Sequence, residues 1–103
     1  MALNMPYVRK QVNMEFKVLT GPQIRAARAL LQWSAEDLSR QSAVSVRTIR
    51  RAELAGHITS MTAANNLAVR RALEAAGVVF IDENGGGPGV RLRTPTRPRL
   101  RNK

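Results

Sequence analysis

The chain has 103 residues, with 17 Lys and Arg against 7 Asp and Glu, a formal net charge of +10 and no cysteine. Its length allows one modest hydrophobic core, so we expect one domain with terminal extensions. The lack of cysteine excludes a disulfide-stabilised scaffold, and no apolar run is long enough to cross a membrane or form a signal-peptide core. The composition therefore predicts a cytoplasmic protein whose partner is a polyanion and not a membrane.

The positive charge is concentrated near the C-terminus. Six basic residues and no acidic residue lie between Arg91 and Lys103. More than half of the net charge belongs to this stretch, so total charge alone does not argue for a nucleic-acid-binding domain. Residues 94–103 contain two prolines among polar and basic side chains and are predicted to be a disordered basic tail. The tail adds sequence-independent phosphate affinity, or only solubility.

Residues 1–19 are predicted to be a flexible leader. The stretch Phe16-Lys17-Val18 alternates apolar and basic side chains, which makes a short strand before the domain the alternative.

The first helix is predicted to begin at Thr20-Gly21-Pro22, because proline is tolerated in the first turn of a helix. Apolar residues at helical spacing predict a buried stripe of Ile24, Ala27, Leu30 and Leu31. Arg28 borders this stripe, where its stem can pack and its guanidinium can reach a carboxylate. Trp33 is expected to fill the core between the first helix and the second.

Two helix starts follow in close succession. Ser34 and Asp37 have the spacing of a capping box, in which the hydroxyl accepts from a backbone N–H and the carboxylate returns to the cap. Ser45 is a good N-cap without an acidic partner. Residues 42–44 allow only a tight turn, so the stretch 34–54 predicts a helix-turn-helix unit.

The second helix of this unit, residues 46–54, has two different faces at about 100° per residue. Ile49 and Ala52 form a small apolar face suited to packing on Leu38. The opposite face carries no acid and consists of Val46, Arg47, Arg50, Arg51 and Leu54. Such a face suits the major groove, where arginine can donate two hydrogen bonds to guanine O6 and N7. We expect Arg47 to read guanine; a merely solvated charged face is the alternative.

This pattern resembles the phage-repressor (Cro-like, Xre) helix-turn-helix family over residues 20–77. The resemblance is carried by Arg28, Ser34, Glu36, Leu38, Val44, Ser45, Thr48, Ile49, Arg51 and Glu53. It implies a mainly α fold, a compact lambda-repressor-like bundle of four or five helices, and a homodimer that binds double-stranded DNA in the bacterial cytoplasm. Two positions depart from the family: Ala35 stands where a DNA-contacting glutamine is common, and Ala43 where the turn often has glycine.

The resemblance also implies roles for single residues. In the family, the positions of Ser45, Val46, Arg47 and Arg51 touch bases or nearby phosphates. With the helical face, this gives the predicted DNA-binding set of Ser45, Val46, Arg47, Thr48, Arg50 and Arg51. The family also pairs the positions of Arg28 and Glu53 as a structural ion pair; two independent surface charges are the alternative.

Phosphate contacts are expected from the start of the helix that Ser34 caps and from the loop after residue 54. In the family, this loop lies along the DNA backbone. The candidates are Ser34, His57, Thr59 and Ser60. A solvated loop with Ile58 tucked inward is the alternative.

The next predicted helix spans residues 63–76. Gly56 is the expected C-cap of the helix before it, Thr62 the N-cap, and Gly77 the residue that ends the long helix. Its predicted inward residues are Val69, Ala72, Leu73 and Ala76. Its predicted outward residues are Asn66, Arg70, Arg71 and Glu74, and Leu67 fits neither face.

Residues 78–93 predict a β-hairpin. Residues 78–81 are β-branched and aromatic, residues 82–89 are a glycine-rich turn, and residues 90–93 alternate apolar and basic. The turn is not a phosphate-binding loop, because it lacks the Lys-Ser/Thr ending and no helix follows it. Since a two-stranded sheet is marginal alone, the hairpin must pack on the bundle or gain a strand from the leader or a second subunit.

These predictions favour a sequence-specific transcriptional regulator that binds a pseudo-palindromic operator as a homodimer through helix 46–54. An antitoxin or anti-activator acting mainly through a protein partner is the alternative. RNA binding through charge alone is less favoured, because no aromatic platform for base stacking is evident. An enzyme, a cofactor and a metal site are not expected, because paired carboxylates, a Ser-His pair and metal-ligand spacing are all lacking.

Overall fold

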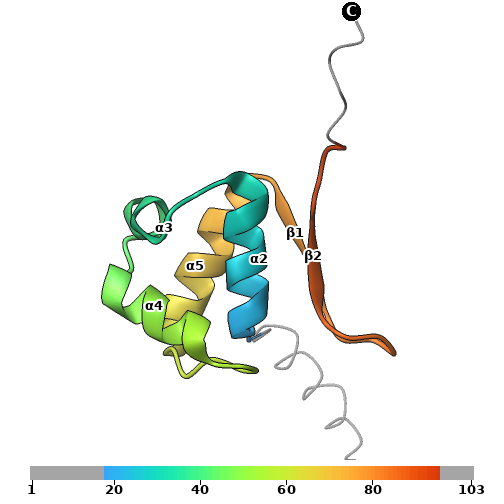
Figure 1. The fold of residues 1–103 in the computed structure, drawn as a ribbon, viewed down its shortest axis with the longest axis horizontal. Coiled ribbons are helices and arrows are strands. Elements are labelled where there is room, and N and C mark those ends of the chain that lie inside the picture. Colours follow the sequence, from blue (N-terminus) through green and yellow to red (C-terminus); the bar gives the residue numbers. More distant parts are fainter. Residues whose placement is uncertain (1–17, 96–103) are drawn as a thin grey trace, which may run out of the picture.

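The computed structural model describes residues 18–95, which form four helices followed by a two-stranded antiparallel sheet (Figure 1). The elements are α2 (Gly21–Leu31), α3 (Ala35–Ser42), α4 (Val46–Leu54), α5 (Ala63–Ala75), β1 (Val78–Ile81) and β2 (Gly89–Leu92). The predicted mainly helical fold with a C-terminal hairpin is confirmed. The predictions for the leader before Val18 and for the tail after Pro95 lie outside the described residues. None of the described helices is long and apolar enough to cross a membrane.

Each of the four helices begins at a hydroxyl side chain that caps the backbone. The predicted capping box of Ser34 and Asp37 is confirmed, and so is the cap at Ser45. Thr62 caps α5 in the same way. The structure adds a second capping box, in which the Thr20 hydroxyl accepts from the Gln23 N–H and the Gln23 side chain accepts from the Thr20 N–H. These caps explain why the four helix starts could be read from the sequence.

The core lies between the helices and the inner face of the sheet. Its largest fully buried side chains are Leu19, Ile24, Leu38, Ile49, Val69, Leu73 and Val78. The stripe predicted for α2 is wrong at Leu30, which is 41% exposed, because the contact face runs from Gln23 and Ile24 through Ala27. Trp33 is half-buried and packs against the edge of the core; the prediction that it fills the core is therefore too strong.

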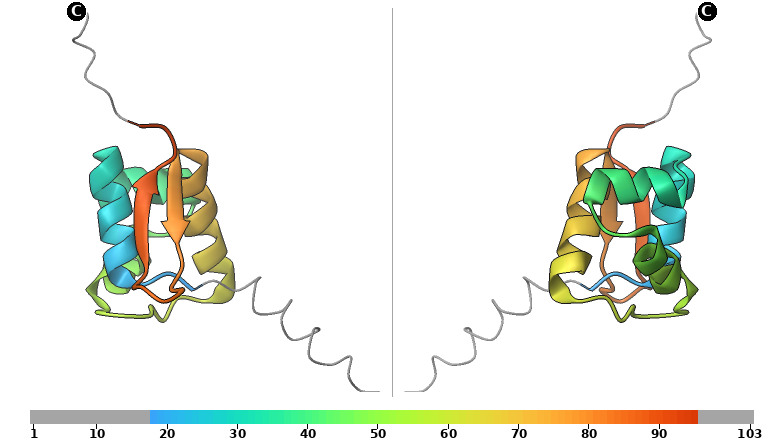
Figure 2. Two further views of the ribbon diagram at one scale, coloured as in Figure 1. Left: turned by 90° about the vertical axis from the view of Figure 1, so that its right-hand side faces the viewer. Right: turned by 90° about the vertical axis from the view of Figure 1, so that its left-hand side faces the viewer.

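The hairpin lies across α2 and α5, on the side of the molecule away from α3 and α4 (Figures 1 and 2). Val78 pairs with Leu92 and Phe80 with Val90, so all four side chains share the face that packs on the core. β2 begins and ends one residue earlier than predicted. The prediction that the hairpin packs on the bundle is confirmed.

Two polar side chains fasten the hairpin to the helices. Gln23 donates through Nε2 to the carbonyl oxygens of Gly89 at 3.1 Å and Ile81 at 3.4 Å. Arg70 of α5 lies over the Phe80 ring, 5.0 Å from its centroid, and donates to Glu74. The outward position predicted for Arg70 is therefore wrong, because the sheet covers that side of α5.

Asn66 was also predicted to point outward and is instead buried. Its side-chain oxygen accepts from the N–H of Leu19 at 3.0 Å, which joins the start of α5 to the segment before α2. Leu67, which fitted neither predicted face, is 41% exposed. At the other end, α5 stops at Ala75 and Ala76 is its cap; Gly77, the residue after the cap, has φ +112°, which confirms the predicted glycine stop.

The end of α4 meets the start of α2 through backbone contacts. Gly21 donates to the carbonyl oxygen of His57 at 2.9 Å, and Thr20 and Ile58 form an isolated antiparallel bridge. A Cβ at Gly21 would lie 2.1 Å from the carbonyl oxygen of Ala55, so only glycine fits there. The C-cap predicted at Gly56 is wrong: Ala55 is the cap, with extended backbone.

Candidate nucleic-acid interface

α3 and α4 are joined by a turn that places an alanine in the left-handed region. Ala43 has φ 63° and donates to the carbonyl oxygen of Ser39 at 2.8 Å. The Ser42 hydroxyl donates to the carbonyl oxygen of Leu38 at 2.7 Å and accepts from the N–H of Val44 at 3.2 Å. The chain therefore makes this turn without glycine, at a backbone cost of roughly 1–2 kcal/mol.

α4 presents its arginines to the outside. Ile49 and Ala52 are buried, whereas Arg47, Arg50 and Arg51 are exposed, so the predicted division of the helix into two faces is confirmed except at Val46, which is half-buried. Leu54 lies on the outward face at 84% exposure. Figure 2 (right) shows α3 and α4 together on the side of the molecule opposite the sheet.

The three uncharged residues of the predicted DNA-binding set make local contacts instead of pointing freely outward. Val46 is half-buried against the core. The Ser45 hydroxyl accepts from the N–H of Thr48 at 3.1 Å and donates to the Thr48 hydroxyl at 3.0 Å. Ser45 and Thr48 therefore begin the helix, and any contact they make with a ligand must coexist with this cap.

The three arginines of α4 differ in their partners. Arg50 pairs with Glu36 of α3, with 2.6 Å between Nη2 and Oε2. The side chains of Arg47 and Arg51 make no hydrogen bond or ion pair with any other residue in the described range. Two of the three guanidinium groups are thus available to an outside acceptor.

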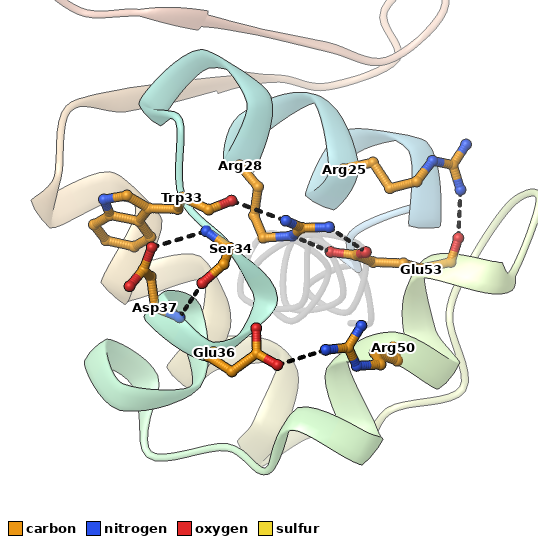
Figure 3. A network of polar contacts seen from close by, with 8 residues as sticks. All are labelled: Arg25, Arg28, Trp33, Ser34, Glu36, Asp37, Arg50 and Glu53. Carbon is orange, nitrogen blue, oxygen red and sulfur yellow. Dashed lines mark hydrogen bonds and ion pairs between the residues drawn. The ribbon is translucent and has the colours of Figure 1, made fainter.

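A nearly buried ion pair holds α4 against α2. Arg28 donates through Nε to Glu53 Oε2 at 2.6 Å and through Nη2 to Glu53 Oε1 at 2.8 Å, so the predicted pair is confirmed as bidentate (Figure 3). Arg28 also donates to the carbonyl oxygen of Trp33 at 2.8 Å, and Arg25 donates to that of Glu53. The hydrogen bond with Glu53 raises the pKa of Arg28 above its ordinary value. The Arg28 guanidinium therefore stays charged, and its two hydrogen bonds with Glu53 hold the end of α4 against α2.

The first turn of α3 carries two acids, and each is paired with an arginine. The Asp37 carboxylate accepts from the N–H of Ser34 at 2.8 Å, which lowers the pKa of Asp37, and it also pairs with Arg40. Glu36 pairs with Arg50. Because the Ser34 hydroxyl accepts from the Asp37 N–H, this predicted phosphate contact already serves as a helix cap.

The remaining predicted phosphate contacts lie in the loop after α4, and they differ in exposure. His57 and Ser60 are exposed, but Thr59 is 5% exposed, so the prediction that it contacts phosphate is wrong. The bridge at Ile58 gives the loop a strand-like alternation, which turns Ile58 outward and Thr59 inward. The alternative with Ile58 tucked inward is therefore also wrong.

Among the described residues, two hollows border this region. One of about 180 Å³ lies between α4 and the start of α5, and its lining residues are Thr48, Arg51, Ala52, Ser60, Met61, Thr62 and Asn65. Sequence reasoning missed Thr62 and Asn65 as neighbours of Arg51, although the cap at Thr62 had marked a helix start there. The other, of about 520 Å³, lies between α2, the loop and β2, and no lysine, arginine or acid is among its lining residues.

A scan against models of known protein families found no match for this chain, and a search of curated proteins found none either. Among the described residues, no three His, Cys, Asp or Glu side chains lie close enough together to hold a metal ion.

Proposed function

We propose that the protein is a sequence-specific DNA-binding transcriptional regulator of the phage-repressor (Cro-like, Xre) type. In this proposal α3 and α4 are a helix-turn-helix unit within a lambda-repressor-like bundle, and α4 enters the major groove. The observation that carries it is the exposed, unpaired Arg47 on the outward face of a nine-residue helix that a nearly buried ion pair holds in place. A rigid support of this kind positions a side chain for base contacts.

The structure supports different roles for the individual arginines. Arg47 lies in the first turn of α4 and in the middle of its outward face, which suits a bidentate contact with guanine. Arg51 borders the hollow beside Ser60 and the N-terminus of α5, where backbone N–H groups favour an anion. We therefore assign Arg51 to a phosphate contact or to a base at the edge of the site.

A short helix reads only a few base pairs, so the proposal includes a homodimer on a pseudo-palindromic operator with half-sites about one helical turn apart. A bacterial cytoplasmic setting and the absence of enzymatic activity belong to the same proposal. The chain's net charge of +10 supports the encounter with DNA but not its specificity.

The test is selection of binding sites from random duplexes, followed by affinity measurements with the full chain. The wild type should enrich one motif, and Arg47→Ala should lose about 1–3 kcal/mol on that motif while affinity for random duplex falls much less. Arg91→Ala is the matched control, because it removes an exposed arginine from β2 on the opposite side of the molecule. Failure to enrich any motif would contradict the proposal.

One observation favours the alternative of an antitoxin or anti-activator. The sheet has only two strands in the described part of the chain, so its backbone edges are open to a further strand, and Ile81 is 36% exposed beside them. A protein partner on this surface would lose affinity with Ile81→Lys, whereas DNA binding through α4 would keep its affinity.

A further inference from the structure

One ion pair ties the outward face of α4 to the neighbouring helix. The Arg50 and Glu36 side chains are 57% and 54% exposed, and their charged atoms are 2.6 Å apart (Figure 3). Glu36 lies in the first turn of α3, and Arg50 lies midway along α4. No other ion pair of the described residues involves an arginine of this face.

The position of Arg50 on the helix explains why it alone is paired. With about 3.6 residues per turn, Arg47 lies in the middle of the outward face, with Arg51 on one flank and Arg50 on the other. Arg51 faces the start of α5, where its neighbours are uncharged, whereas Arg50 faces α3 and its acid. Arg50 contacts Glu36 through Nη2, so a phosphate that binds Arg50 lies close to the negative charge of Glu36, whether or not it displaces that carboxylate.

We propose that Glu36 is a specificity-determining residue that acts through Arg50, by holding its guanidinium away from the phosphates of arbitrary DNA. The inference rests on the proposed function and deepens it. Non-specific binding depends almost entirely on phosphate contacts, so a competitor for one arginine weakens it directly. Binding to the operator depends also on base contacts such as that of Arg47, and the Glu36–Arg50 pair stays formed in that complex.

The expected size follows from the exposure of the pair. An exposed ion pair changes an equilibrium constant by up to about fivefold. Glu36→Gln should therefore raise affinity for random duplex by about fivefold. The plot of log affinity against log salt concentration should become steeper by about one unit, because Arg50 gains one phosphate contact and one more counterion is released. Affinity for the selected site should rise less than about twofold, so discrimination between the two falls.

The experiment is a double-mutant cycle on random duplex and on the selected site, with wild type, Glu36→Gln, Arg50→Ala and the double variant. If Glu36 acts through Arg50, Glu36→Gln changes nothing in the Arg50→Ala background. Glu83→Gln is the control for loss of one exposed negative charge, since it lies in the hairpin turn away from α4. Thermal melts of each variant show that the fold is kept.

The outcomes separate the inference from the function on which it rests. An equal gain in both backgrounds would mean that Glu36 repels phosphate by charge alone, which overturns the inference. No gain on random duplex, or an equal gain on the selected site, overturns it as well. A wild type that prefers no site contradicts the proposed function and the inference together, whereas site preference with no coupling between Glu36 and Arg50 contradicts the inference alone.

Discussion

Glu53 connects α4 to α2 through both its side chain and its carbonyl oxygen. It is 7% exposed and accepts both hydrogen bonds of the Arg28 fork, while its own carbonyl accepts from Arg25. Glu53→Ala leaves the largely buried Arg28 guanidinium without its acid and should destabilise the fold by about 3 kcal/mol. Urea unfolding measures this effect.

Glu53→Gln is a milder substitution whose stability can be compared with that of Glu53→Ala. The amide keeps one acceptor for Arg28 but loses the charge, so its destabilisation should be smaller than that of alanine. We expect DNA affinity to fall only indirectly, through the unfolded fraction and the loosened position of α4, because Glu53 lies on the inner side of the helix. A melting temperature unchanged in Glu53→Ala would show that the pair has no structural role.

Gly21 gives a second prediction for a single residue. A methyl group there would lie 2.1 Å from the carbonyl oxygen of Ala55 and 2.9 Å from that of Ala52. Because both obstacles are backbone atoms, Gly21→Ala should cost about 1–3 kcal/mol in the free energy of unfolding. Gly56→Ala is the control: nothing lies within 4 Å of its added Cβ, and stability should stay close to that of wild type. Equal stabilities of the two variants would mean that α2 and α4 can move apart without lowering the free energy of unfolding.

Single residues also mark the limit of what the sequence predicts. The serine caps of α3 and α4 and the outward arginines follow from local spacing, so they could be read directly. The capping box of Thr20 and Gln23 has the same kind of local signature and could have been found. Asn66 could not, because its partner Leu19 is 47 residues away and nothing near Asn66 in the sequence predicts that contact.

At the scale of elements, α3 should weaken in acid. The hydrogen bond from the Ser34 N–H lowers the pKa of Asp37, and the Glu36 backbone N–H, followed by the charge of Arg50, lowers that of Glu36. Since the folded state binds these protons less readily than the unfolded chain, both groups stabilise the fold above about pH 4. This stability is lost as pH falls through the lowered pKa values.

The variant Asp37→Asn tests this pH dependence. It should lower the melting temperature at neutral pH, where Asp37 is charged and completes the capping box. It should have little effect at a pH below the pKa of Asp37 in both the folded and the unfolded chain. Melting curves between about pH 7 and pH 2 give the comparison. Glu83→Gln removes one carboxyl from the hairpin turn and serves as the matched control. A difference between Asp37→Asn and wild type that is the same at all pH values would refute the role of the charge.

The elements themselves were predicted better than their contacts. Helix and strand boundaries agree within about one residue, because caps, glycines and β-branched runs are local signals. The packing of the sheet on α2 and α5 depends on Gln23 and Arg70, whose partners come from distant segments. Arg70, which was predicted to lie at the surface, instead connects α5 to the sheet through Phe80.

At the scale of the whole molecule, the candidate interface and the sheet occupy opposite sides (Figure 1). α2 and α5 form the layer between them. A partner on the open sheet would therefore leave the arginines of α4 accessible, so the proposed function and its alternative are compatible in one molecule. Binding of DNA and of a protein can be measured separately with Arg47→Ala and Ile81→Lys.

The basic C-terminal stretch is expected to contribute affinity without specificity. Deletion of residues 94–103 removes four positive charges, so affinity should fall alike on all duplexes and the salt dependence should become less steep. Titrations at several salt concentrations on random and selected duplexes measure both effects. Loss of binding to the selected site alone would show that these residues read sequence.

The backbone contact between Gly21 and the end of α4 has a consequence for how such a protein can diverge. Because main-chain atoms meet there, this contact does not depend on which side chains fill the core. Under the proposed function, the outward side chains of α4 can then be replaced one at a time while the angle of approach to DNA is inherited. Such a protein could acquire a new target sequence while it keeps the same binding geometry on DNA.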